Sequence, residues 1–405
     1  MVSVRQFVIG AIVLGLAGAA LPAAASDVAL DPTFSGDGKV LVGDRGAATL
    51  SLARAAGDVY LAGSQQVGDH YVPFVSRLDD NGALDPTFSG DGLRQLSSVR
   101  GKFWTTGLTV DPAGRALLVA QSRQRTVIAR FTPQGDLDAT FSSDGMREFA
   151  GGASTIYLFP RIIVDSQGRI VVAAMNLLKD SGSDVVIRRL MPSGANDPAW
   201  SGDGAKTINK GATDWIDALA VDANDHVLLG SETGGKSPAS VYRFRPNGSP
   251  DQSFSDDGVA TFRFQPHLNT FPLGIEISAG DEITVAAASC CQSGGTTYGA
   301  ARLLPNGDFD RAYGDGGVLG LSCLQCSPTW GDVDGGRVAI VIDPYQESGM
   351  TRLARINSDG TTIEHQSVDI DPANDFEPVY PVEIDGQRTL VGGYANHHAF
   401  VARLP

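Results

Sequence analysis

The nine residues LDPTFSGDG stand at positions 84–92, and the same phrase stands letter for letter at positions 30–38. Four further stretches keep its pattern of aspartate, aromatic residue and closing glycine. These are LDATFSSDG, NDPAWSGDG, PDQSFSDDG and FDRAYGDGG, which begin at Leu137, Asn196, Pro250 and Phe309. Successive copies begin 54, 53, 59, 54 and 59 residues apart. Such regular spacing indicates a repeat architecture, in which each repeat is one supersecondary unit.

The segments between the copies keep a constant order. A first apolar segment ends in a tight turn, such as VDPAGR at 110–115, and a second apolar segment follows it directly. A third segment ends in a turn closed by glycine, such as RFTPQG at 130–135, and a short fourth segment follows the phrase. Four short strands in a repeat of this length are typical of one blade of a β-propeller.

Counting the turns gives the number of blades. The turn between the first two strands recurs seven times, near Gly57, Gly114, Gly168, Asn224, Gly280, Gly335 and Gly386. The third strand carries an arginine seven times, at Arg77, Arg130, Arg189, Arg243, Arg302, Arg355 and Arg403. The sequence therefore predicts an all-β fold, a seven-bladed propeller with four antiparallel strands per blade, as a single domain over residues 26–405.

The two ends of the repeat array are out of phase by one strand. The chain stops after the third strand of the last repeat, and it opens with a phrase that belongs before a fourth strand. We therefore expect residues 39–42 to form the outer strand of the last blade, beside residues 399–404. This closure would remove the open sheet edge that an unclosed array exposes.

The first 25 residues have the features of a cleaved secretory signal peptide. Residues 1–5 carry one arginine, residues 7–21 are uncharged and apolar, and three alanines precede Ser26. We expect cleavage after Ala25 and a monomer in the periplasm or outside the cell, with no membrane span. The whole chain has 31 basic and 46 acidic residues, a net charge of −15, which disfavours a nucleic-acid partner.

The repeated phrase resembles the delta-60 repeat family of bacterial β-propeller proteins, which is defined by an LDPxF…G unit. The resemblance covers essentially the whole chain after residue 25 and implies an exported propeller. It implies no reaction, and no cofactor is expected.

The recurring residues of the phrase have structural explanations. We expect the aromatic residue to pack as an apolar anchor and the Asp-Gly pair to form a turn. The members of this aromatic set are Phe34, Phe88, Phe141, Trp200, Phe254 and Tyr313. The alternative is a repeated calcium loop built on Asp37, Asp91, Asp144, Asp203 and Asp257. Calcium takes six to eight oxygen ligands, and each phrase offers one well-placed acid, so no metal site is predicted.

The third-strand arginines are expected to form structural ion pairs, because a ligand site rarely needs the same residue in every blade. Their predicted partners are the first aspartates of the phrases: Asp31, Asp85, Asp138, Asp197, Asp251 and Asp310. We found no nucleotide-binding loop, zinc-protease motif or serine-nucleophile elbow in the chain.

Four cysteines fall in two loops of the fifth and sixth repeats: Cys290, Cys291, Cys323 and Cys326. In an up-and-down blade these two loops emerge on the same face of the disc. In an exported protein an even number of cysteines favours disulfides, so we predict two bonds between the loops, with the connectivity open. A zinc site made of the four thiolates is the alternative.

The loops opposite the phrases share no pattern, and divergent loops on a rigid scaffold are the usual place for recognition. Several bring an aromatic residue to the first strand of a blade: Trp104, Tyr157, Trp215, Phe271, Trp330 and Tyr380. These six are the predicted ligand-binding residues; the alternative is that they pack between blades. The predicted function is a non-enzymatic binding or scaffold module for a glycan, peptide or protein. The alternative is a hydrolase or lyase acting on a polysaccharide, which clustered carboxylates with raised pKa values in the channel would favour.

Overall fold

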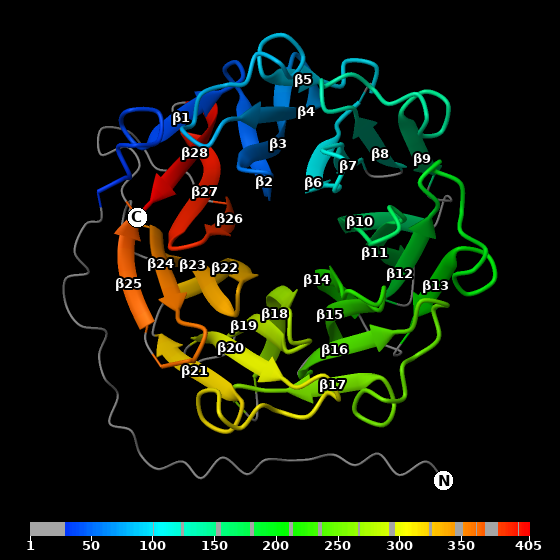
Figure 1. Ribbon diagram of the computed structural model, residues 1–405, viewed down its shortest axis with the longest axis vertical. Helices are drawn as coiled ribbons and strands as arrows, with labels where there is room; N and C mark the ends of the chain where they lie inside the picture. The colour runs from blue at the N-terminus through cyan, green and yellow to red at the C-terminus, as the bar shows by residue number, and fades with distance from the viewer. Residues whose placement is uncertain are drawn as a thin grey trace.

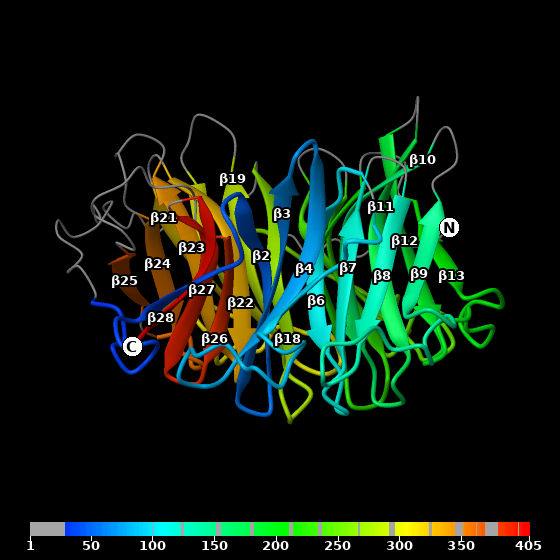
Figure 2. The ribbon, with the colours of Figure 1, turned by 90° about the horizontal axis from the view of Figure 1, so that it is seen from above.

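The computed structural model describes most of the chain after residue 28. The described residues are 29–99, 101–122, 125–150, 155–178, 182–209, 214–233, 237–265, 268–290, 296–323, 326–344, 351–361, 363–368, 380–395 and 397–405. They form 28 strands in seven four-stranded antiparallel sheets arranged around a central axis (Figure 1; seen from the edge of the disc in Figure 2). This arrangement confirms the predicted seven-bladed propeller. The described residues contain no helix that is long and apolar enough to cross a membrane. The predicted signal peptide lies outside the described residues.

Each blade runs from an inner strand at the axis to an outer strand at the rim (Figure 1). Blade 1 is β2 (Ala47–Ala55), β3 (Asp58–Val67), β4 (His70–Leu78) and β5 (Leu93–Gln95). Blade 2 is β6 (Trp104–Val110), β7 (Ala116–Gln121), β8 (Arg125–Phe131) and β9 (Met146–Ala150). Blade 3 is β10 (Thr155–Val164), β11 (Ile170–Leu178), β12 (Gly182–Leu190) and β13 (Ala205–Ile208).

The remaining blades repeat this order. Blade 4 is β14 (Asp214–Val221), β15 (Val227–Thr233), β16 (Ala239–Phe244) and β17 (Val259–Phe262). Blade 5 is β18 (Asn269–Ile277), β19 (Ile283–Cys290), β20 (Thr296–Leu303) and β21 (Val318–Cys323). Blade 6 is β22 (Cys326–Asp334), β23 (Arg337–Pro344), β24 (Thr351–Ile356) and β25 (Ile363–Val368). Blade 7 is β26 (Tyr380–Asp385), β27 (Arg388–Ala395), β28 (His398–Leu404) and β1 (Lys39–Val42).

The ring is closed by the two ends of the described chain. Strand β1 pairs antiparallel with β28, in a register that places Lys39 opposite Ala402 and Val42 opposite Ala399. Blade 7 therefore takes its outer strand from the start of the chain, as the phase of the repeats predicts. The outer edge of β28 is therefore covered by a fourth strand, as in the other six blades.

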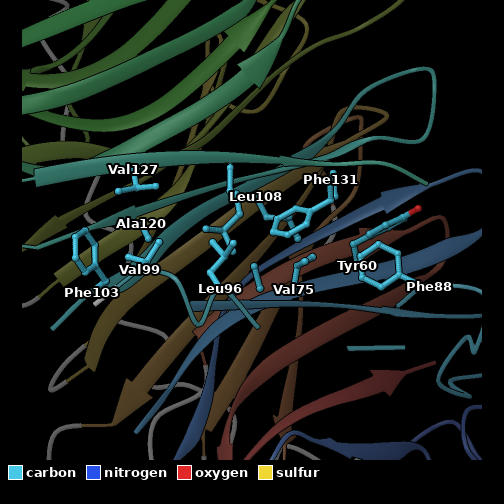
Figure 3. Close-up of a cluster of buried hydrophobic side chains, with 14 residues drawn as sticks. Tyr60, Val75, Phe88, Leu96, Val99, Phe103, Leu108, Ala120, Val127 and Phe131 are labelled. Atoms are coloured by element: carbon cyan, nitrogen blue, oxygen red, sulfur yellow. The ribbon is translucent and has the colours of Figure 1, made fainter. Parts of the chain in front are cut away.

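The apolar core is a ring of seven clusters, each one between two neighbouring blades. Figure 3 shows the cluster between blades 1 and 2, where Tyr60 and Phe88 of one blade lie with Leu108 and Phe131 of the other. The middle strands are buried on both faces, which explains their continuous runs of apolar residues, such as ALLVAQ in β7. Blade-to-blade packing is thus what holds the disc together.

The Asp-aromatic phrase and the third-strand arginine form one recurring staple. In six blades the guanidinium lies 2.6–2.9 Å from the first aspartate of the phrase and 4.6–5.3 Å from the centre of the phrase's aromatic ring. All six aromatic side chains are fully buried. These contacts confirm both predicted roles, the apolar anchor and the structural ion pair. In the sequence, Ile363 stands eight positions after the seventh arginine, Arg355, where the other blades have the aspartate, and Arg355 Nε donates to Thr389 Oγ1 at 3.1 Å.

The staple also joins each blade to the next. Arg77 Nη1 donates to the Pro133 carbonyl at 2.8 Å, and the Ser89 amide donates to the Gln134 carbonyl at 2.7 Å, both in the next blade's glycine turn. Gly135 ends this turn with a φ of +84°, and a Cβ atom there would lie within 3.2 Å of the Phe88 ring. Glycine is therefore required twice, by backbone conformation and by close approach.

The aspartates that could have formed calcium loops have a different role. Each accepts a hydrogen bond from the backbone amide two residues later, at 2.9–3.1 Å, which is a turn-stabilising contact. The five are Asp37, Asp91, Asp144, Asp203 and Asp257. Within the described part of the chain, no group of three or more histidine, cysteine or acidic residues could hold a metal ion.

Candidate functional site: the loop face and the central channel

The inner strands bring one residue from each blade to the same level of the central channel. Every inner strand has a register shift against its neighbour, between residues 49/51, 105/107, 158/161, 216/218, 272/274, 328/330 and 380/382. A bulge bends the strand and changes the direction in which its side chains point. Because all seven bulges coincide, they define a common level from which positions in different blades can be compared. Each inner strand begins on the face opposite the phrases, here called the loop face.

Four of the six predicted aromatic residues occupy the same position, two residues before the first bulge residue. They are Trp104, Tyr157, Trp215 and Phe271, on the adjacent blades 2 to 5. The equivalent residues of blades 1 and 6 are Ala48 and Ser327. The four positions therefore form an arc along one side of the loop-face end of the channel, here called the aromatic arc.

The described members of the aromatic arc differ in exposure. Trp104 and Trp215 are each 40% exposed, whereas Phe271 is half-buried and packs against the core between blades 5 and 6. The side chains of Tyr157 and Tyr380 lie outside the described residues. Trp330 lies deeper, just after its bulge, and is half-buried against the core between blades 6 and 7. Two indoles are thus available on the loop face.

The exposed ring of Trp104 has a neighbour that the sequence did not reveal. Its ring lies 5.3 Å from that of Tyr71, at an interplanar angle of 31°. The pair is held by a backbone connection between blades, in which the Tyr71 amide donates to the Gly101 carbonyl at 3.2 Å. The preceding residue, Phe103, is fully buried, whereas Trp104 points outward. Exposed His70 and Lys102 lie beside the pair in sequence.

Below the aromatic arc, one arginine reaches across the channel. Arg161 is on β10 of blade 3, and its guanidinium carbon lies 5.5 Å from the ring centre of Trp330 on β22 of blade 6. Its Nε donates to the Asp217 carbonyl of blade 4 at 3.2 Å. Blades 3 and 6 are on opposite sides of the ring (Figure 1). Arg161 and Trp330 therefore span the channel at the level of the bulges.

Asp217 is the bulge residue of β14 and stands beside this arginine. Burial raises the pKa of its carboxyl to about 7, although the charge of Arg161 opposes the rise and Glu232 adds to it. Its Oδ2 is buried and accepts no hydrogen bond among the described residues. A carboxyl group in this setting exchanges a proton near neutral pH.

Two further acids lie on the inner strands of blades 6 and 7. Asp332 Oδ2 accepts a hydrogen bond from the Ile384 amide at 2.7 Å. Burial raises the pKa of Asp332 to about 6, partly offset by backbone hydrogen bonds, and burial followed by the charge of Asp332 raises the pKa of Glu383. A negative charge on one carboxyl disfavours ionisation of the other, so the two groups titrate as a coupled pair. The sequence motifs did not point to these three acids. Their position inside apolar inner strands is the one feature of the sequence that distinguishes them.

The cysteine loops lie together at the loop face, as predicted. Strand β19 ends at Cys290, β21 ends at Cys323 and β22 begins at Cys326. Cys323 is buried, and it is not a free thiol. Cys291 lies outside the described residues, so the pairing of the four stays a prediction.

A separate groove of about 920 Å³ lies at the rim, away from the channel. It is lined by residues of the outer strands β1 and β5 and of the neighbouring turns, among them Leu41, Leu84 and Arg94.

Comparison with known proteins agrees with this geometry. Residues 113–141, which include β7, β8 and the first five residues of the phrase that begins at Leu137, match a family model. Its description is "Domain of unknown function (DUF5122) beta-propeller". The family is a β-propeller family. No curated protein matches the chain.

Solved structures with the same fold include two lyases. The chain resembles a catalytically inactive virginiamycin B lyase from Staphylococcus aureus with quinupristin, with a TM-score of 0.53 and 12% identity over 91% of this chain and 98% of that one. It also resembles the polysaccharide lyase Uly1, with a TM-score of 0.53 and 8% identity over 88% and 89% of the two chains. At these identities the likeness is one of fold alone.

Proposed function

We propose that this propeller is an exported glycan-binding module whose ligand lies on the aromatic arc, with the Tyr71–Trp104 pair as its main platform. The observation that carries the proposal is the exposed, tilted ring pair at the start of β6. Leaving a large indole exposed sacrifices the free energy of its burial, roughly 1.5–3 kcal/mol for a large apolar side chain. Exposed rings gathered on one face are typical of a recognition site.

A glycan fits this surface better than a protein partner. The exposed rings are few and separated, whereas a stable protein interface buries a continuous patch of roughly 800 Å² on each partner. Aromatic positions that recur on four adjacent blades match a ligand that is itself a chain of similar rings. Exposed His70 and Lys102 next to the platform supply hydrogen-bonding groups for hydroxyls. A peptide with aromatic side chains is the competing ligand, and the experiment below separates the two.

The remaining parts of the proposal concern the compartment. The n-region, apolar run and alanine cleavage site at residues 1–25 support export to the periplasm or the medium. The proximity of the cysteine loops at one face supports the two disulfides, which an oxidising compartment would preserve.

One observation favours a second candidate function, a hydrolase or lyase acting on a polysaccharide. The channel holds carboxyls whose pKa values are raised to about 7 and about 6, the range that suits general acid–base chemistry. If the protein is such an enzyme, incubation with the bound glycan yields new reducing or unsaturated ends. In that case Asp217→Asn abolishes the products while retaining binding.

The experiment is a combined glycan and peptide array, followed by titration of the best ligand. We expect the protein without residues 1–25 to bind a glycan, and Trp104→Ala and Tyr71→Ala each to weaken binding by about tenfold or more, as loss of an aromatic anchor does. Leu41→Ala is the matched control, because Leu41 is 45% exposed on the outer strand β1, far from the channel. Binding that Trp104→Ala leaves unchanged contradicts the proposed site, and a peptide ligand contradicts the proposed class.

A further inference from the structure

Contacts with two other blades hold the guanidinium of Arg161 in place, but none of them is a salt bridge among the described residues. Its Nε donates to the Asp217 carbonyl oxygen, and its guanidinium carbon lies over the Trp330 ring at 5.5 Å from the ring centre. Its Nη1 and Nη2 atoms have no hydrogen-bond or ion-pair partner among the described residues. The side chain remains partly exposed. Arg130, by contrast, uses its Nη1 and Nη2 atoms in the staple, where they donate to the Pro192 carbonyl and to Thr140 Oγ1.

The nearby acid does not supply the missing partner. Asp217 meets Arg161 through its backbone carbonyl, and its carboxyl Oδ2 is buried with no hydrogen bond among the described residues. Burial raises the pKa of that carboxyl to about 7, so it is partly neutral near physiological pH. A cation whose acidic neighbour is partly neutral retains its attraction for an external anion.

We infer that Arg161 is a receptor for a carboxylate of the ligand, so that the glycan bound on the aromatic arc is an acidic one. A guanidinium presents two parallel N–H donors that match the two oxygens of a carboxylate, and the bond from Arg161 Nε to the Asp217 carbonyl leaves the two terminal nitrogens for such a ligand. Arg161 follows Tyr157 on β10 and lies beside the strand that carries Trp215. A sugar on the aromatic arc therefore lies above this arginine on the loop-face side. The inference rests on the proposed function and adds the class of the ligand.

The binding of an acidic group is expected to depend on pH. Asp217 faces Arg161 from β14, and Glu232 approaches it from β15. When Asp217 ionises, its negative charge repels an incoming carboxylate and competes for Arg161. Affinity for an acidic ligand therefore falls as the pH rises through about 7, and Asp217→Asn removes that dependence.

The probes are tri-galacturonic acid and its methyl ester, which have the same ring shape and differ in charge. We expect the protein to bind the acid at least about tenfold more tightly than the ester, the value of one strong charge-assisted contact. Arg161→Gln should remove that preference and leave the affinity for the ester unchanged. Arg161→Lys keeps the positive charge but not the two parallel N–H donors, and it should keep part of the preference for the acid. This variant shows that the loss in Arg161→Gln does not come from misfolding. Arg94→Gln, on the outer strand β5, removes the same charge far from the channel and should change nothing.

Each outcome decides between the claims. Equal binding of the acid and the ester by the unmodified protein overturns the carboxylate site. If Trp104→Ala still weakens both probes in that case, the glycan-binding function stands. A preference that survives in Arg161→Gln, or that Arg94→Gln also removes, overturns the assignment to Arg161. If neither probe binds, the carboxylate inference falls, and the array decides separately on the proposed function.

Discussion

Arg403 Nε donates to Asp31 Oδ2 at 2.9 Å, joining residues 372 positions apart in the chain. The other five staples link an arginine to an aspartate only eight positions later, as Arg130 and Asp138 do. The contact that stabilises a turn within the other blades thus joins the two ends of the described chain within blade 7 and closes the ring. Its partners are almost fully buried, so it is protected from solvent screening.

Removal of the closing strand should destabilise the protein severely. Deletion of residues 27–44 removes β1 and Asp31, which exposes the edge of β28 and leaves Arg403 buried without its partner. We expect aggregation or loss of cooperative unfolding, observable by size-exclusion chromatography and calorimetry. The milder Asp31→Ala should cost about 3–5 kcal/mol, the typical penalty for breaking a buried pair. A truncated protein that unfolds like the parent would contradict ring closure.

One staple is incomplete and can be repaired. Arg189 is fully buried, and its Nη1 and Nη2 have no hydrogen-bond partner in the described part of the chain. In the equivalent staple of blade 2, Thr140 Oγ1 accepts from Arg130 Nη2 at 2.9 Å, whereas blade 3 has Ala199 at that position. Ala199→Thr should therefore raise the free energy of unfolding by about 0.5–1.5 kcal/mol.

A matched variant gives the control for this repair. Ala312→Thr makes the same change in blade 5, where Arg302 is about one-fifth exposed and water can serve as the acceptor. Its effect on chemical denaturation should be smaller than that of Ala199→Thr. Equal effects of the two variants would argue against burial as the cause.

The free energy of unfolding should depend on pH in a way that reflects the raised pKa of Asp217. Its carboxyl has a pKa of about 7 in the folded protein and roughly 3.9 in an unfolded chain. Between these values the folded state binds more protons, so this group's favourable contribution is fully present below about pH 4 and is lost as the pH rises through about 7. Asp217→Asn should therefore gain stability relative to the parent as the pH rises from 4 to 8. Thermal unfolding of both proteins at several pH values tests this, and a difference that shrinks over that range would refute it.

Asp251 should show the opposite dependence. Hydrogen bonds from Ser253 and the charge of Arg243 outweigh the effect of burial and lower the pKa of Asp251 to about 2. Its contribution is therefore present above about pH 4 and is lost as the pH falls through about 2. Asp251→Asn should lower the free energy of unfolding at pH 7, and the deficit should disappear near pH 2. Denaturant titrations at the two pH values provide the comparison.

The cysteines should be oxidised in the mature protein. Mass spectrometry after digestion without reduction should link Cys290 or Cys291 to Cys323 or Cys326. Reduction should lower the free energy of unfolding by roughly 2–5 kcal/mol. Four free thiols that bind one zinc ion would contradict this prediction.

The sequence was sufficient to predict the fold because every repeat carries the same local signals. The Asp-Gly turns, the third-strand arginines and the phase of the chain ends together predicted seven blades, the staple and the pairing of β1 with β28. These features follow from contacts within one blade or between neighbours, so their spacing in the chain is readable. The sequence also pointed to Trp104 and Trp215 as candidate binding residues, because both stand near the start of an inner strand.

The channel could not be predicted in the same detail. Arg161, Asp217 and Trp330 come from three different blades, and no spacing in the chain relates them. Asp217 faces the channel because β14 has its bulge there, and the sequence WIDALAV does not mark a bulge. The contact between Tyr71 and Trp104 depends on the route of the loop that joins blades 1 and 2, which only the folded backbone defines.

The most direct test of the central claim is to locate a bound glycan by crystallography of the protein without residues 1–25, soaked with the best ligand from the array. We expect a sugar ring stacked on Trp104 and Tyr71, with further rings along the aromatic arc toward Trp215. A sugar held instead in the rim groove beside Leu41, or on the face that carries the phrases, would contradict it.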